Sequence, residues 1–66
     1  MRRNYIKEYR MLRGIETKVE LAHLAGVPRS TIGEIENHKM RGSDDTLERI
    51  AKALGLSKAE LYVNPE

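Results

Sequence analysis

The stretch ELAHLAGVPRSTIGEIEN, residues Glu20–Asn37, decides the fold of this 66-residue chain. Its helical pattern breaks at Gly26 and restarts at Pro28. Glycine readily ends a helix because it tolerates the left-handed backbone conformation. Proline suits the first helical position because its missing amide would be unpaired there in any case. We therefore predict two helices joined by a sharp turn over about residues 18–37, the second of them starting at Pro28.

The second helix of this pair has two unlike faces. Ile32 and Ile35 lie on the same side as Pro28, and we expect them to hold the helix against a core. Small and polar residues gather on the opposite side at helical spacing: Arg29, Ser30, Gly33 and Asn37. A helix rarely exposes a polar, glycine-containing face of this kind without a use for it.

Glycines and capping residues divide the rest of the chain into further helices. One is predicted over about Asn4–Arg13, with Gly14 as its stop, and the first helix of the pair begins at the capping-box pattern of residues 17–20. A fourth begins at Ser43 or Asp44, and a fifth follows a second capping box at residues 57–60. The expected core residues of the first and fourth helices are Ile6, Tyr9, Leu12, Leu47, Ile50, Ala51 and Leu54. Five short helices with short connections predict a compact all-α domain.

The composition sets further limits. The chain has no cysteine, phenylalanine or tryptophan, so its core must be aliphatic and no disulfide or thiolate metal site can stabilise it. A domain of this size buries only about 60% of its unfolded surface, so self-association would help it. No apolar run is long enough for a signal peptide or a membrane span. We expect one domain over residues 1–66, in the cytoplasm.

The formal net charge of +2 is unevenly distributed. Residues 1–13 carry five basic residues and one acidic residue, a net charge of +4. Residues 42–66 carry three basic and five acidic residues, a net charge of −2. This asymmetry suggests an anionic partner on one side, although a solvated surface of mixed charge gives the same pattern.

Residues that could carry catalysis or hold a metal are few. His23 and His38 are 15 positions apart, with no cysteine and no paired carboxylates to complete a metal site. The serines show no nucleophile signature, and no glycine-rich loop that could hold a phosphate is present. We expect a protein that is not an enzyme and that needs neither a cofactor nor a metal.

Three segments carry a family resemblance: IKEYRMLRG, TKVELAHLAGVPRSTIGEIEN and DDTLERIAKALGLSKAEL. Together they resemble the Cro/phage-repressor type of helix-turn-helix protein, the XRE-like group, from about Ile6 to Leu61. The resemblance implies a compact five-helix, lambda-repressor-like fold whose second motif helix enters the major groove of DNA. Ala22 stands where the two motif helices touch, and Gly26 stands in the turn between them.

Four features depart from the family pattern. Lys18 stands where glutamine is usual, and Gly33 and Glu34 stand where serine or a basic residue is common. His38 replaces the usual glycine at the end of the second motif helix. One extra residue, Ile15 or Glu16, lies in the turn before the first motif helix.

The resemblance implies two classes of DNA contact. Arginine can pair with guanine through two hydrogen bonds, and Arg29 begins the outward face together with its small neighbours. The expected base-contacting residues are Arg29, Ser30, Gly33 and Glu34. The expected phosphate-contacting residues, which flank that face, are Thr17, Lys18, Asn37, Lys39 and Arg41.

Two structural expectations accompany these contacts. Some family members have an ion pair between these two helices, and Arg10 and Glu36 match them residue by residue at the two positions of that pair. Such a pair would fix the first helix against the end of the recognition helix. The C-terminal apolar run Leu61, Tyr62 and Val63 is predicted to join two copies into a homodimer, because the last helix is too short to bury all of it. The alternative is that these residues only cap the core of the monomer.

The implied function is transcriptional regulation. We expect a repressor that acts as a dimer on a pseudo-palindromic DNA operator and is nucleoid-associated when bound. The alternative on the same fold is an antitoxin-like regulator that docks on a partner protein. Such members usually need an additional segment, whereas only residues 62–66 follow the last predicted helix. A non-specific nucleic-acid binder is disfavoured by the modest net charge, since non-specific affinity comes from neutralising phosphates.

Overall fold

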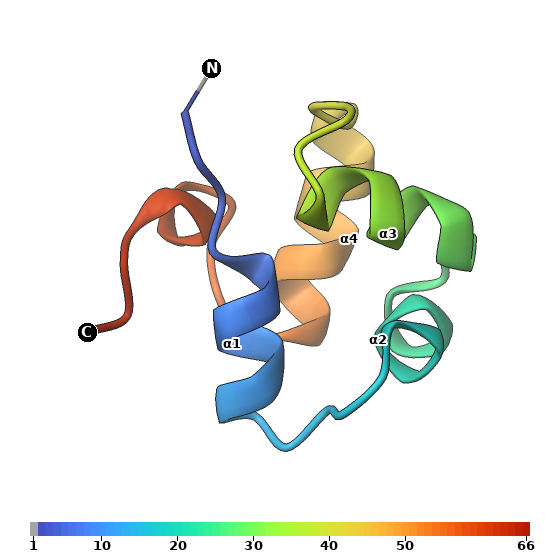
Figure 1. Cartoon of the computed structure of the whole chain (residues 1–66), viewed down its shortest axis with the longest axis horizontal. Helices are drawn as coiled ribbons and strands as arrows, with labels where there is room; N and C mark the ends of the chain where they lie inside the picture. The colour runs from blue at the N-terminus through green and yellow to red at the C-terminus, as the bar shows by residue number, and fades with distance from the viewer. Residues whose placement is uncertain (1) are drawn as a thin grey trace.

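The computed structural model describes residues 2–66, which form four α-helices and one 3-10 turn (Figure 1). The elements are α1 (Ile6–Leu12), α2 (Lys18–Ala25), α3 (Arg29–Glu36), α4 (Asp44–Ala53) and the 3-10 turn η1 (Ala59–Tyr62). Helix α2 packs against both α3 and α4. In the part of the chain that the structure describes, no helix is long and apolar enough to cross a membrane.

The expected fifth helix is wrong as a helix, because η1 is a single 3-10 turn of four residues. The predicted capping pair is present in one direction: the Ser57 amide donates to Oε1 of Glu60 over 3.0 Å. The backbone of Val63 is already extended, with φ −103° and ψ 126°, and it ends the turn.

Helix α1 begins two residues later than expected. The side chain of Asn4 is buried and bonds at both ends: its Oδ1 accepts from the Ile6 amide at 3.2 Å, and its Nδ2 donates to the Ile35 carbonyl at 2.8 Å. Asn4 therefore caps α1 from outside the helix and joins it to α3. Leu12 is exposed, which corrects its predicted place in the core: six residues beyond Ile6 it lies about 120° round the helix from it, outside the face buried by Ile6, Tyr9 and Arg10.

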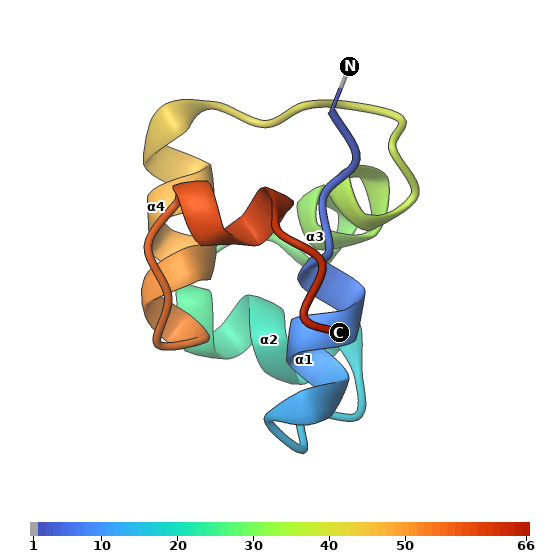
Figure 2. The same cartoon turned by 90° about the vertical axis from the view of Figure 1, so that its left-hand side faces the viewer.

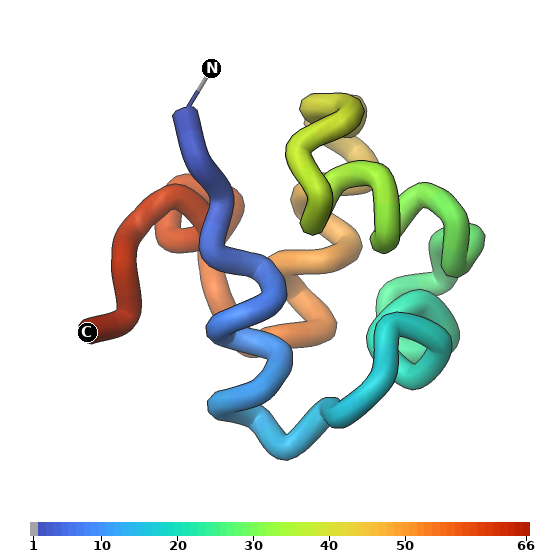
Figure 3. The backbone as a smooth tube through the Cα atoms, in the orientation of Figure 1, coloured from blue at the N-terminus to red at the C-terminus, as the bar shows by residue number. Residues whose placement is uncertain are grey.

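The turn between α2 and α3 follows the predicted chemistry. Gly26 ends α2 in the left-handed conformation with φ 71°. Pro28 is the N-cap of α3 with an extended backbone, so it precedes the first helical residue rather than occupying that position. In Figure 3, α2 is seen nearly end-on while α3 runs across the view, so the two helices cross steeply.

The core is aliphatic apart from Tyr9. It contains Ile6, Tyr9, Ile15, Leu21, Ala22, Ala25, Ile32, Ile35, Leu47, Ile50, Ala51, Leu54 and Leu61. Hydrogen bonds join the two ends of the chain: the Tyr5 amide donates to the Leu61 carbonyl at 2.7 Å, and the Tyr9 hydroxyl donates to the Val63 carbonyl at 2.7 Å. The sequence leaves open whether Ile15 or Glu16 is the extra residue before α2. Ile15 is a core residue, whereas Glu16 is exposed.

The loop from Asn37 to Ser43 passes over one end of the molecule between α3 and α4 (Figure 2). His38 begins it with φ 61°, the one positive φ among the described residues other than glycine. A glycine takes this conformation without steric cost, so His38 occupies a position whose backbone favours glycine. Ser43 ends the loop and caps α4, where its Oγ accepts from the Thr46 amide at 3.2 Å.

Candidate nucleic-acid interface

Helix α3 carries all four of the predicted base-contacting residues. Ile32 and Ile35 are buried beneath the helix, whereas Arg29, Ser30 and Glu34 are exposed and Gly33 is half-buried. The two faces of α3 are therefore separated as the sequence pattern predicts, and the small residues leave the helix backbone accessible. Such a helix can enter a groove of DNA and present side chains to the base edges.

The beginning of α2 lies beside this face. One open depression is lined by Thr17, Lys18, Val19, Arg29, Ser30 and Gly33. It brings two of the predicted phosphate contacts together with three of the predicted base contacts. Thr17 also caps α2, because its Oγ1 accepts from the Glu20 amide at 3.1 Å. This hydrogen bond leaves the Thr17 hydroxyl proton free to be donated, as a phosphate contact requires.

The cations of the predicted site are not neutralised within the protein. Among residues 2–66, the basic side chains in ion pairs are Arg3, Arg10, Arg49 and Lys58. The four predicted DNA-contacting cations make no such pair: Lys18, Arg29, Lys39 and Arg41. The acidic start of α4 is partly neutralised instead, by pairs between Asp45 and Arg49 and between Asp44 and Lys58. Cations are thus available for an anionic partner on the α3 side.

Four predicted contacts lie outside the depression: Glu34 and Asn37 near the end of α3, and Lys39 and Arg41 in the loop beyond it. Glu34 is exposed, and its backbone carbonyl accepts from the Lys39 amide at 2.8 Å, which closes the end of α3. Asn37 is the exposed C-cap of α3, where its amide donates to the Gly33 carbonyl at 3.0 Å. Both residues are therefore nearer the carboxyl end of α3 than Arg29 and Ser30 are.

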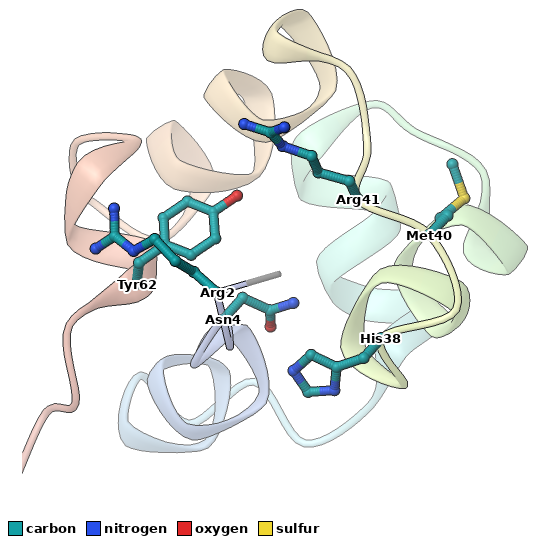
Figure 4. Close-up of a pocket in the computed structure, with 6 residues that line it drawn as sticks. All are labelled: Arg2, Asn4, His38, Met40, Arg41 and Tyr62. Carbon is teal, nitrogen blue, oxygen red and sulfur yellow. The ribbon is translucent and has the colours of Figure 1, made fainter.

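The loop cations divide between two surroundings. Lys39 is exposed just beyond α3, whereas Arg41 lines a second pocket together with Arg2, Asn4, His38, Met40 and Tyr62 (Figure 4). The Arg2 guanidinium carbon lies 4.9 Å from the centroid of the Tyr62 ring. The N-terminal segment thus brings another cation to the side of the molecule that holds the loop after α3.

A buried ion pair fixes the orientation of α3. Nε of Arg10 donates to Oε2 of Glu36 at 3.0 Å, and the second guanidinium contact, Nη2 to Oε1, is 3.3 Å long. Arg10 also donates from Nη1 to the Ile15 carbonyl at 2.9 Å. One side chain of α1 is therefore bonded both to the end of α3 and to the turn that precedes α2.

The predicted dimer-forming run is split by the fold. Leu61 is 0% exposed and belongs to the core of the monomer, so its assignment to an interface is wrong. Val63 is 53% exposed and Tyr62 is half-buried beside Arg2. The apolar surface that this run offers to a second copy is limited to Tyr62 and Val63.

Two residues beside the proposed DNA contacts are not predicted from the sequence: Val19, which lines the depression at α3, and Arg2, which lines the pocket with Arg41. Arg2 contributes only to the net charge of residues 1–13, and Val19 only to the capping-box pattern of residues 17–20. The signal for Val19 was present, because it lies outside the buried stripe of Leu21, Ala22 and Ala25. No residue pattern near the start of the chain pointed to the contact between Arg2 and Tyr62.

The histidines take no part in a shared centre. His23 is an exposed residue of α2 and His38 lies in the loop after α3. Within the described residues, no three or more histidine and carboxylate side chains are grouped so that they could hold a metal ion.

Comparison with known proteins gives one match. The model of a helix-turn-helix family matches residues 6–61, which span all the described helices and include both motif helices. No curated protein and no solved structure matches the chain. Because the matched range covers most of the 66 residues, this chain belongs to the helix-turn-helix family of DNA-binding transcription regulators, and within it to the Cro/phage-repressor (XRE-like) type.

Proposed function

We propose that the protein is a sequence-specific repressor that binds a pseudo-palindromic operator in double-stranded DNA as a homodimer. The observation that best supports this proposal is the outward face of α3. Arg29 and Ser30 are exposed on this face, and Ile32 and Ile35 on the opposite side of the helix are buried in the core. Two-fold symmetry would place two such helices about one DNA turn, roughly 34 Å, apart.

In this proposal the site residues have separate roles. Arg29 and Ser30 contact base edges, Gly33 allows close approach, and Glu34 accepts from the amino group of a cytosine or adenine. The phosphate contacts are Thr17, Lys18, Asn37, Lys39 and Arg41. Phosphate contacts set the position of the helix on the duplex, whereas base contacts supply the sequence preference.

The test is a selection of bound duplexes from a random double-stranded library. We expect a two-fold symmetric site whose half-sites are about 10 base pairs apart from centre to centre. Recovery of sequences with no common site would contradict sequence-specific binding. Recovery of a single half-site without a symmetric partner would contradict the dimer but retain the DNA-binding face.

A second candidate is a regulator that docks on a partner protein, and the surface of α1 favours it. Met11 and Leu12 are both more than 60% exposed, and they line a depression with Tyr5 and the C-terminal residues 64–66. Exposed apolar side chains that adjoin one another are typical of protein contacts. Replacing both Met11 and Leu12 by lysine tests this candidate: full repression in cells with unchanged operator binding would exclude a required partner on this surface.

A further inference from the structure

Val19 is the one residue with an apolar side chain among those that line the DNA-facing depression. Val19 is 53% exposed and lines this depression with Lys18 and Arg29. A single exposed valine is common on protein surfaces and needs no explanation by itself. Its position matters here because it shares the depression with the residues expected to meet DNA.

Gly33 is a second, independent observation from the same depression. It lies inside α3 without a positive φ, and a Cβ built on it meets no atom within 4 Å. Neither the backbone conformation nor the packing of the protein therefore requires glycine at this position. Glycine also weakens a helix relative to alanine. If a group outside the protein approaches the α3 backbone closely at this position, that approach would explain why the residue has no side chain.

We propose that Val19 and Gly33 together form a notch that holds the 5-methyl group of a thymine in the operator. This inference rests on the proposed function, because it assumes that α3 enters the major groove. The thymine methyl is the apolar group that an A·T pair presents there. Lys18 and Arg29 flank the notch, and no carboxylate lines the depression, so its charge suits a methyl group carried on a polyanion.

The notch makes Val19 a specificity-determining residue of the DNA-binding face. Hydrogen-bonding side chains such as Arg29 and Ser30 read donors and acceptors on the base edges. Val19 reads a methyl group instead, so it favours thymine over uracil, which has the same hydrogen-bonding pattern. If the contacted thymine of the operator were replaced by cytosine, the same contact would favour 5-methylcytosine over cytosine.

The experiment uses the duplex recovered by the library selection and removes one thymine methyl group at a time. Each thymine is replaced by deoxyuridine, and binding of the wild-type chain is measured by titration. We expect a loss of about fourfold at one thymine in each half-site, the equivalent of the ~0.8 kcal/mol of one buried methyl group. The Val19→Ala variant should show little or no loss at that same thymine, because its methyl contact is already gone.

Two further variants separate the notch from general effects on the protein. Leu24→Ala is the matched control, since Leu24 is 56% exposed on the same helix but lies outside the depression. It should keep the full deoxyuridine loss. Gly33→Ala should fold with an unchanged or higher Tm, because its Cβ meets open space, yet bind the operator at least severalfold more weakly.

The outcomes are distinct. If the wild type and Val19→Ala lose the same factor at every thymine, or if no thymine shows a loss, the notch is refuted while sequence-specific binding stands. Operator affinity for Gly33→Ala equal to that of the wild type would likewise refute close approach at Gly33. If the selection yields no common site, the proposed function fails and this inference fails with it.

Discussion

Arg10 and Glu36 form a buried ion pair in which Nε lies 3.0 Å from Oε2 and the two side chains are only 5% and 1% exposed. The pair joins α1 to the end of α3, the helix that carries the proposed base-contacting residues. In a low-dielectric interior, a charge that loses its partner is much more costly than an exposed one. The stability of the protein and the orientation of its recognition helix therefore depend on the same contact.

Removing one partner should be strongly destabilising. We expect Arg10→Met or Glu36→Leu to lower the free energy of unfolding by about 3–5 kcal/mol, because the remaining charge stays buried. The double variant should be more stable than either single variant, since it leaves no buried charge. Urea unfolding followed by circular dichroism measures all three. A loss of less than about 1 kcal/mol in both single variants would contradict this prediction, because it would show that water solvates the remaining charge.

The backbone at His38 predicts a stabilising substitution. An L-residue in the left-handed region costs roughly 1–2 kcal/mol, whereas glycine adopts it freely at an entropic cost of about 0.5–1 kcal/mol. We expect His38→Gly, at φ 61°, to raise stability by about 0.5–1 kcal/mol and Tm by about 3–6 °C. The matched control is His38→Ala, which keeps the conformational demand and should give no gain. A higher Tm for alanine than for glycine would contradict this explanation.

Glu60 gives a pH dependence with a defined direction. The hydrogen bond from the Ser57 backbone amide lowers the pKa of the Glu60 carboxyl below its ordinary value of 4.5. Because the folded-state pKa is the lower one, the contribution of Glu60 to stability is complete above pH 4.5 and is lost as the pH falls below it. Thermal unfolding between pH 7 and pH 3 should show a smaller decline for Glu60→Gln than for the wild type. Parallel declines would contradict the assignment.

Much of the fold followed from the sequence because its signals are local. Gly26 ends α2, Ser43 caps α4 through its hydroxyl, and the stripe of Leu47, Ile50, Ala51 and Leu54 is buried. Each of these signals depends on residues within one or two helical turns. The outward face of α3 was also predicted correctly, because Ile32 and Ile35 alone decide which side of that helix is buried.

The errors arose where distant segments decide the outcome. Leu12 continues the apolar spacing of α1, but the face of α1 that packs on the rest of the protein is the one with Ile6, Tyr9 and Arg10, and Leu12 lies outside it. Leu61 looked like surface in a short C-terminal run, yet the Tyr5 amide donates to its carbonyl and the side chain is buried in the core. The sequence alone does not reveal that residues 5 and 61 lie together. For the same reason it does not predict the contact between Arg2 and Tyr62.

The proposed dimer predicts a concentration-dependent association that involves Val63. Val63 is 53% exposed, and its hydrogen bonds are made by its backbone: the carbonyl accepts from the Tyr9 hydroxyl, and the amide donates to the Glu60 carbonyl at 3.1 Å. Val63→Glu should therefore fold normally but weaken dimerisation by about tenfold or more. Sedimentation equilibrium measures the association, with Leu24→Glu on α2 as the control for an added exposed charge. A wild-type chain that stays monomeric at high concentration, with and without operator, would refute the dimer.

Base readout and phosphate contact can be separated by comparing Arg29 with Lys39. Arg29 begins α3 and shares the depression with Ser30 and Gly33, and base contact is the role proposed for it. Lys39 is exposed in the loop beyond α3, where a phosphate is the expected contact. Both are unpaired cations among the described residues, so charge alone does not distinguish them.

The two alanine variants should therefore fail in different ways. Arg29→Ala should weaken operator binding by about 1–3 kcal/mol and relax the preference at one base pair of each half-site. Lys39→Ala should weaken operator and random duplex about equally, and should reduce the slope of log K against log salt by about one per subunit. Titrations of both variants on both duplexes at several salt concentrations measure these effects. Equal losses on operator and random DNA for Arg29→Ala would make Arg29 a phosphate contact, and base readout would then rest on Ser30 and Glu34.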